Sequence, residues 1–288
     1  YKMGGRVMQA TQQKANQNNL LEKVFKLSEH GTNVKTEIIA GITTFMTMAY
    51  ILAVNSNMLA EAGMDAGAVF VATALSATIS CFVMAFLSNY PIALAPGMGL
   101  NAFFAYTVVL QMGYTWQMAL LGVFIEGVLF IILTVTSLRE QIINCIPKDL
   151  KNAVTAGVGL FIASVGMTNA GIINTANGTL ALSSLHDPLV VLSVVGLVIA
   201  GILVCRNVRG ALLLSILLTS AIGMLTGIVT LPTKIVSLNV PSLAPTFMQA
   251  FSVPLEKIFS LDMVIVVFTF LFMDLFDSVG FLVGVAAK

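Results

Sequence analysis

Apolar stretches and short polar loops alternate along most of this chain. A helix needs about 20 apolar residues to cross the hydrocarbon core of a membrane, and most of these stretches approach that length. The pattern therefore predicts repeated membrane crossings, preceded by a polar tail (residues 1–20) and a short amphipathic helix at the membrane surface (Leu20–Leu27). With one interrupted stretch counted as a single crossing, eight crossings are expected: Glu37–Val54, Gly67–Ser88, Pro91–Leu110, Trp116–Leu138, Ala153–Thr168, Pro188–Cys205, Ala211–Leu231 and Met263–Ala287.

The third stretch, Pro91–Leu110, contains two prolines and two glycines, and we call it the broken segment. Irregular backbone persists at membrane depth only where protein or a watery cavity covers it, and such a span points to the binding site of a secondary transporter. Its helical part runs for about 12 residues, or about 18 Å, which is too short for a core of about 30 Å. We therefore expect extended backbone at Ala95–Met98 and a helix that starts inside the membrane at about Gly99–Asn101. The alternative is a surface loop between two helices.

Lys and Arg are distributed unevenly over the predicted loops. Short cytoplasmic loops of membrane proteins carry an excess of these residues. With the N-terminus inside, 12 of them fall on the inner side, and only Lys234 and Lys257 fall on the outer side. If the broken segment did not cross, the cations of loops 139–151 and 206–209 would move outside. The sequence thus predicts a multi-pass protein of the cell membrane, with a cytoplasmic N-terminus and a broken segment that crosses.

Composition agrees with a membrane protein. Hydrophobic residues make up 58% of the chain and charged residues 9%, about a third of the charged fraction of a soluble domain. A net charge of +1 gives no reason to expect nucleic acid. The three separate cysteines and two histidines show no spacing typical of a disulfide framework or a metal site. We expect lipid around the helices, no metal ion and no organic cofactor.

Three acidic residues lie inside predicted spans, where ionisable groups are costly and often functional. Asp274 and Asp277 stand three positions apart near the middle of the last span, so they lie on similar faces, and Ser278 follows them. Glu126 lies near the middle of the fourth span. Each acid could instead be a protonated carboxyl or one tied to a neighbouring helix by hydrogen bonds. Thr44 in the first span is a further polar candidate, although Thr is also common at contacts between membrane helices.

Four motifs resemble those of the AzgA-like purine permeases, a branch of the nucleobase–cation symporter-2 family. They occur in the order found in that family, and the resemblance extends from about Leu21 to Lys288. The motifs are Ile42-Thr-Thr-Phe-Met-Thr-Met-Ala-Tyr-Ile51, Ala95-Pro-Gly-Met-Gly-Leu-Asn-Ala-Phe-Phe104, Phe124-Ile-Glu-Gly-Val-Leu-Phe130 and Leu275-Phe-Asp-Ser-Val-Gly280.

This resemblance implies an all-α polytopic membrane protein of fourteen segments in two inverted seven-segment repeats, as in uracil permeases. Short strands of the third and tenth segments would face one another, and a homodimer is compatible with this architecture. This chain would hold the first repeat and one helix of the second, with the remainder of the parent protein missing. The implied divisions are a cytoplasmic tail and interfacial helix (1–36), core-domain segments 1–4 (37–138), gate-domain segments 5–7 (139–231), an extracytoplasmic loop (232–262) and segment 8 of the core (263–288).

The resemblance further implies proton-coupled import of purine bases by alternating access between the core and the gate. Asp277 matches the acid with which the wider family holds the base, and Ala95–Ala102 match its third-segment site. Ser278 stands where the wider family has His, which favours hypoxanthine, guanine or adenine over uracil or xanthine. The expected substrate-binding residues are Asp277, Asp274, Ala95, Gly97, Met98, Gly99, Asn101, Ser278 and Thr44, and the expected proton-coupling residues are Asp277, Asp274 and Glu126.

Two other classes of function stay open from the sequence. A membrane channel would share the apolar spans, and electrical recording compared with tracer uptake would separate it from a carrier. An intramembrane aspartyl protease needs two aspartates that face one another and share a proton. Asp274 and Asp277 are instead expected on a single helix, which disfavours the protease.

Overall fold

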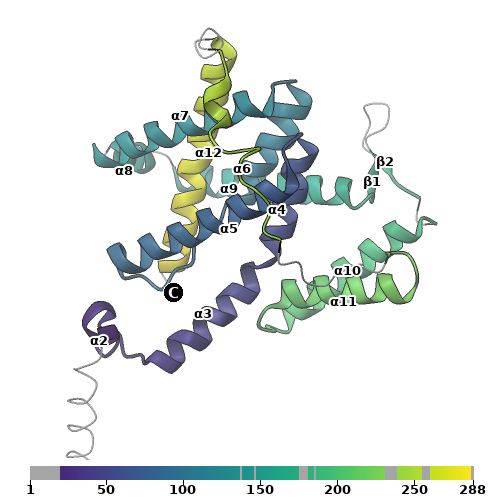
Figure 1. Cartoon of the computed structure of the whole chain (residues 1–288), viewed down its shortest axis with the longest axis horizontal. Coiled ribbons are helices and arrows are strands. Elements are labelled where there is room, and N and C mark those ends of the chain that lie inside the picture. Colours follow the sequence, from purple (N-terminus) through teal and green to yellow (C-terminus); the bar gives the residue numbers. More distant parts are fainter. Residues whose placement is uncertain are drawn as a thin grey trace, which may run out of the picture.

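The computed structural model describes residues 20–136, 138–145, 147–174, 181–184, 186–230, 239–254 and 260–286. Regular structure in these ranges is helical except for one hairpin, in which β1 (Ile173–Asn174) pairs antiparallel with β2 (Ala181–Leu182) (Figure 1). The helices are α2 (Leu20–Phe25), α3 (Val34–Met48), α4 (Tyr50–Glu61), α5 (Ala66–Val83), η1 (Met84–Ser88), α6 (Met98–Ala102), η2 (Phe103–Gln111), α7 (Trp116–Val135), α8 (Leu138–Cys145), α9 (Lys148–Asn169), α10 (Pro188–Cys205), α11 (Ala211–Leu225), η4 (Gln249–Ser252) and α12 (Leu261–Ala286).

Several of these helices have the length and composition of membrane spans. Within the described residues, four helical runs are long and apolar enough to cross a membrane: Val34–Glu61, Ala66–Ser88, Trp116–Val135 and Pro188–Cys205. Two further apolar helical runs, Met98–Gln111 and Ala211–Leu225, are shorter. The chain is therefore a polytopic, mostly helical membrane protein, as the sequence predicts.

The span at α10 begins and ends as predicted. Asp187 caps its N-terminus by accepting a hydrogen bond from the Leu189 N–H at 2.9 Å. Pro188 occupies the first turn, where the backbone N–H that proline lacks would have no partner within the helix. The seventh span is shorter than the predicted Ala211–Leu231. It ends at Leu225, followed by a turn in which Gly227 has φ +73°, a conformation that favours glycine.

The first span is longer than predicted and is interrupted. It continues through α4, and a turn at Ala49 separates α3, which slopes upward in Figure 1, from the more upright α4. The hydroxyls of Thr43, Thr44 and Thr47 each donate to the carbonyl four residues earlier, at 2.8–2.9 Å. Such bonds tend to bend helices. Because of the added turns, Asn55 lies inside α4, although the span was expected to end at Val54.

The buried core surrounds the helical half of the broken segment. Phe103 of η2 packs edge-to-face on Phe270 of α12, with ring centroids 5.2 Å apart. Gly122 allows α7 to approach α12, because a Cβ atom there would lie 3.4 Å from Met263 Sδ. The surface-loop alternative is therefore wrong for this half. The core side chains come from α4, α6, η2, α7, α12 and the turn after α4: Met58, Ala62, Ala102, Phe104, Ala105, Val108, Ala119, Val266 and Phe270.

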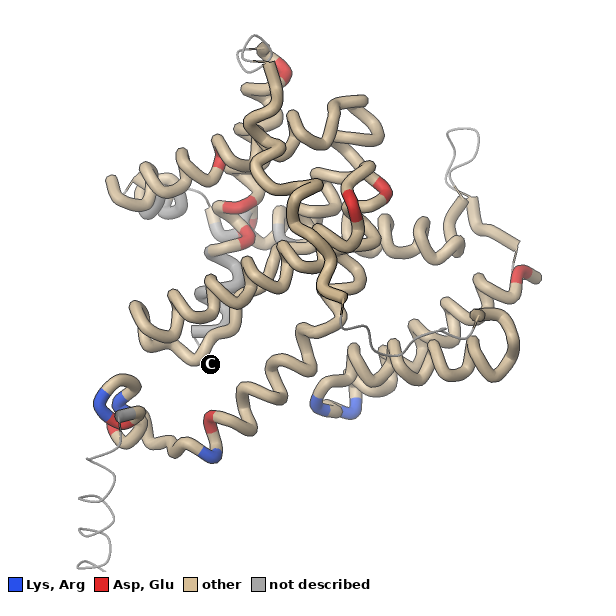
Figure 2. The backbone as a smooth tube through the Cα atoms, in the orientation of Figure 1, with Lys and Arg blue, Asp and Glu red and all other residues tan. Residues whose placement is uncertain are grey.

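Two groups of basic residues lie at one side of the molecule. Figure 2 shows them around α2 and the start of α3, and again at the turn between α10 and α11, all in the lower part of the view. The residues at the second position are Arg206 and Arg209. Both regions were predicted to be cytoplasmic, and they lie at a common side of the molecule.

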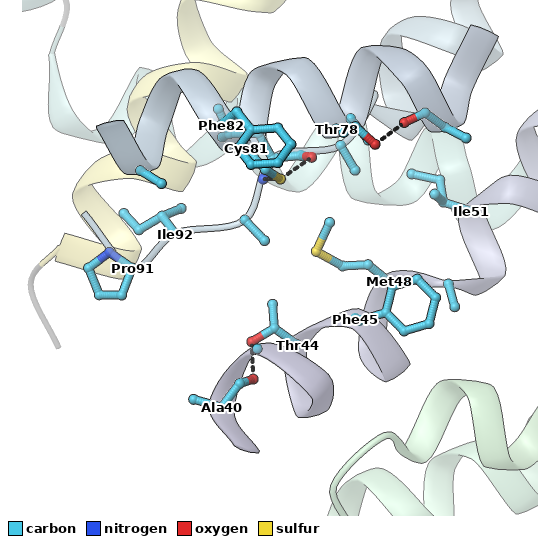
Figure 3. Close-up of a pocket in the computed structure, with 18 of the residues that line it drawn as sticks. Ala40, Thr44, Phe45, Met48, Ile51, Thr78, Cys81, Phe82, Pro91 and Ile92 are labelled. Atoms are coloured by element: carbon cyan, nitrogen blue, oxygen red, sulfur yellow. Dashed lines mark hydrogen bonds between the residues drawn. The ribbon is translucent and has the colours of Figure 1, made fainter. Parts of the chain in front are cut away.

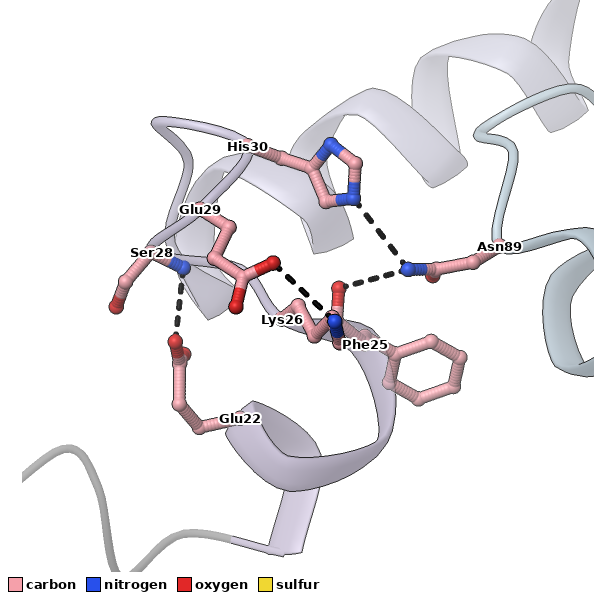
Figure 4. Close-up of polar contacts among 7 residues, drawn as sticks. All are labelled: Glu22, Phe25, Lys26, Ser28, Glu29, His30 and Asn89. Atoms are coloured by element: carbon pink, nitrogen blue, oxygen red, sulfur yellow. Dashed lines mark hydrogen bonds and ion pairs between the residues drawn. The ribbon is translucent and has the colours of Figure 1, made fainter.

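Helix α2 is attached to the end of η1 (Figure 4). Asn89 adopts a left-handed conformation, with φ 51°, and its Nδ2 donates to the Phe25 carbonyl at 3.2 Å. The same nitrogen lies 3.4 Å from His30 Nε2, and the Phe25 and Phe86 rings are 5.5 Å apart. The predicted amphipathic helix thus exists, and it contacts the chain just before the broken segment.

Candidate functional site

The broken segment has the interruption that its prolines and glycines predict. Residues 89–97 form no helix, Gly97 is extended, and α6 begins at Met98, one residue earlier than expected. The first helical bond joins the Asn101 N–H to the Gly97 carbonyl at 3.1 Å, and no side chain caps the first turn. We refer to residues 89–97 as the non-helical stretch. Among the described residues it pairs with no strand.

A thiol secures the non-helical stretch against α5. The Leu94 N–H donates to Cys81 Sγ at 3.2 Å, and the thiol donates back to the Leu94 carbonyl at 3.4 Å. This pairing supplies partners to backbone groups that an unpaired strand at membrane depth would otherwise leave without any. A lone cysteine in an apolar span carries no sequence signal for such a contact, so this pairing is visible only in the structure.

Two glycines allow close approach to the start of α6. A Cβ atom on Gly97 would lie 3.2 Å from Asp277 Oδ2 of α12, and one on Gly99 would lie 2.9 Å from Val158 Cγ1 of α9. Neither glycine has a positive φ, so glycine is favoured here because it lacks a side chain and not because of its backbone conformation. The structure therefore brings Asp277 beside the first turn of α6, as the family resemblance implies.

The three predicted acids differ in their surroundings. Asp277 is exposed in this chain, whereas Asp274 accepts a hydrogen bond from Ser278 Oγ at 3.3 Å one turn along α12. Glu126 of α7 is 7% exposed, and its Oε1 atom has no hydrogen-bond partner among the described residues. Glu126 lies on α7, which packs against α12, the helix that carries Asp274 and Asp277.

A buried polar chain connects α6 to two neighbouring helices. Asn101 Nδ2 donates to Asn55 Oδ1 of α4 at 2.5 Å, and Asn55 Nδ2 donates to Thr73 Oγ1 of α5 at 2.8 Å. Sequence reasoning singled out Asn101 but did not identify Asn55 and Thr73 as the other members of this chain. An amide side chain in an apolar helix indicates that a hydrogen-bond partner is present nearby. The sequence does not show which residue this is, because Asn55 lies 46 residues away along the chain.

A cavity of about 590 Å³ lies between α3, α4, α5 and the non-helical stretch (Figure 3). Its lining is mostly apolar and includes Met48, Phe82 and Ile92. Of the predicted site residues it is lined by Thr44 and Ala95, while Asp277 does not line it. The Thr44 hydroxyl donates to Ala40 of its own helix at 2.9 Å. Gly97, Asn101 and Asp277 are not among the residues that line this cavity.

Comparison with known proteins identifies the family to which this chain is similar. The model of a family described as the permease family matches residues 35–287. The chain is 48% identical to the guanine/hypoxanthine permease PbuG of Bacillus subtilis over 278 residues, which is 93% of this chain and 63% of that protein. It is 42% identical to the adenine permease AdeP of Escherichia coli over 271 residues, which is 93% of this chain and 60% of that protein. The chain spans about three fifths of the length of these relatives.

Proposed function

This chain belongs to the permease family, and we propose that it provides the substrate-binding elements of a proton-coupled importer of purine bases in the cell membrane. The names of its relatives favour hypoxanthine, guanine or adenine as the substrate. The observation that carries the proposal is the place of Asp277 beside Gly97, where an acidic side chain adjoins the start of a half-helix.

The chemistry of this group suits a purine. A carboxylate can accept hydrogen bonds from the ring N–H groups of the base, and Asp277 is exposed to receive them. The first turn of α6 carries N–H groups that no side chain caps, and these can donate to an acceptor on the base. In this proposal the substrate-binding group comprises Asp277, Gly97, Met98, Gly99 and Asn101, while Ala95 and Thr44 line the neighbouring cavity.

Proton coupling is assigned to the carboxyls of α7 and α12. Asp277 would change its protonation state as the base enters, and Asp274 and Glu126 would exchange a proton with it along the packed pair of helices. Alternating access would then move the core domain (37–138 and 263–288) against the gate domain (139–231). The gathering of Lys and Arg at one side supports a cytoplasmic N-terminus, because such residues favour the inner side.

Uptake of radiolabelled hypoxanthine tests this function. The complete coding sequence that includes this chain is expressed in cells that lack their own purine permeases. Uptake should exceed that of empty cells, compete with unlabelled guanine or adenine but not uracil, and collapse with a protonophore. Uptake that persists in the presence of the protonophore would contradict proton coupling. If the protein is present in the membrane but takes up no purine, the proposed function is wrong. Ionic currents far larger than the tracer flux would indicate a channel instead.

A further inference from the structure

Asn55, Thr73 and Asn101 link three helices through two hydrogen bonds that share one amide. Asn55 uses both sides of its amide, since Nδ2 donates to Thr73 Oγ1 and Oδ1 accepts from Asn101 Nδ2. Asn55 is 2% exposed and Thr73 is 4% exposed. Buried polar groups of this kind are costly to leave unpaired, so the arrangement resists local change.

The direction of these bonds determines what Asn101 can offer to a ligand. An amide presents donors on its nitrogen and acceptors on its oxygen. The nitrogen of Asn101 faces Asn55, and within the described residues Asn101 Oδ1 accepts no hydrogen bond. Rotation of the Asn101 amide alone would set its oxygen against Asn55 Oδ1, with two acceptors in contact. In the observed arrangement the Thr73 hydroxyl accepts from the nitrogen of Asn55, which leaves Asn55 Oδ1 to accept from Asn101.

We propose that Asn55 and Thr73 are positioning residues that orient the Asn101 amide, so that its carbonyl oxygen is the acceptor for an N–H or amino group of the purine. This inference rests on the proposed function and deepens it, because it explains how two buried residues outside the broken segment act on substrate recognition. Asn101 touches the base, whereas Asn55 and Thr73 act through it. Loss of one hydrogen bond from such a chain changes an equilibrium by about fivefold.

A double-mutant cycle separates positioning from ordinary helix packing. The complete coding sequence is used, and KM and maximal rate of labelled hypoxanthine uptake are measured for T73V, N101A and the double variant, each normalised to protein in the membrane. T73V keeps the shape of the side chain but removes its oxygen. We expect KM to rise by about fivefold in T73V, with the maximal rate nearly unchanged. In the N101A background, T73V should raise KM no further, because the group it orients is absent.

Two matched variants serve as controls. T73S keeps the hydroxyl and should restore the parent KM. T78V removes a hydroxyl from the same helix, but Thr78 Oγ1 donates only to Ala74 of its own helix at 2.7 Å, so its KM should match the parent. If T73V does not accumulate in the membrane, Thr73→Ala removes the same oxygen together with one methyl group, and the same pattern is expected.

Each outcome decides the inference. If T73V raises KM equally with and without Asn101, then Thr73 only stabilises the helices. The inference would be wrong, although purine uptake by the parent protein would still support the proposed function. A T73V variant with the parent KM would overturn it as well. If the parent protein itself takes up no purine, the proposed function fails first, and the inference fails with it.

Discussion

Asp274 and Asp277 occupy neighbouring turns of one helix but differ in what surrounds them. Asp277 adjoins the glycine at the start of α6, whereas Asp274 is hydrogen-bonded by Ser278. Asp277→Asn keeps the shape and removes the charge, so we expect uptake to be lost or uncoupled with expression retained. A missing partner for a base N–H should weaken affinity by about 5- to 150-fold, and Asp274→Asn should be milder. Normal, pH-dependent uptake by Asp277→Asn beside a dead Asp274→Asn would reverse the two roles.

Gly97 offers a more local test of the same contact. A Cβ atom there would lie 3.2 Å from Asp277 Oδ2, so the carboxylate must retreat by a few tenths of an ångström. Gly97→Ala should therefore raise the KM for hypoxanthine several-fold while the protein still reaches the membrane, a change of about 1 kcal/mol. Gly127→Ala is the matched control, because a Cβ on Gly127 meets no atom within 4 Å. An unchanged KM in Gly97→Ala would indicate that the position of the Asp277 carboxylate does not affect substrate binding.

Single-residue chemistry was only partly readable from the sequence. An acidic residue within an apolar span is energetically costly, and so Asp277 could be recognised from the sequence as a candidate functional residue. Asn55 could not be assigned a partner, because the helices that meet it are set by packing between distant segments. Thr44 is a polar candidate by residue type, and the structure adds that its hydroxyl donates to Ala40 of its own helix and that the residue lines the cavity beside Ala95. Sequence spacing shows which face of a helix a residue occupies, but not which neighbour that face meets.

Among the elements, the broken segment was predicted best because its causes are local. Proline and glycine stop a helix by sterics and by backbone freedom, which are properties of the residues themselves. The β1–β2 hairpin and the bend between α3 and α4 were not foreseen. The hairpin needs only two residue pairs, Ile173 with Leu182 and Asn174 with Ala181, and so leaves no alternating pattern to read. The bend depends on hydroxyl groups whose choice of acceptor is decided only once the helix has formed.

Packing of α6 against α9 gives a prediction about stability. A Cβ on Gly99 would lie 2.9 Å from Val158 Cγ1 and 3.6 Å from Ile162 Cδ1, so the two helices must separate or the valine must turn. Gly99→Ala should lower the free energy of unfolding by about 1–3 kcal/mol, as overpacked cores do. Thermal denaturation of the purified protein measures the change. Val158→Ala in the same protein should recover part of the loss, whereas no recovery would place the clash elsewhere.

At the scale of the whole molecule, charge fixes the expected orientation in the membrane. Positions 148 and 180 are predicted to lie on opposite sides of the membrane, and the basic residues around α2, α3 and the α10–α11 turn lie at one side of the molecule. In a background without the native cysteines, Lys148→Cys should react with an impermeant maleimide only after the cytoplasmic side is exposed. Leu180→Cys should react on intact cells, because this position is predicted to lie on the outer side. The opposite labelling pattern would overturn the count of crossings.

The thiol that holds Leu94 makes the non-helical stretch chemically addressable. Cys81 is half-buried beside a cavity of about 590 Å³, while Cys145 and Cys205 are exposed and hold no backbone. A permeant alkylating agent that reaches Cys81 removes its thiol hydrogen and inserts a bulky group between α5 and residues 89–97. N-ethylmaleimide should therefore inhibit uptake, Cys81→Ser should resist it, and a protein with serine at 145 and 205 should remain sensitive. Equal inhibition of Cys81→Ser and the parent would place the sensitive group elsewhere. One sulfur atom would thus make transport by this protein vulnerable to electrophiles and oxidants.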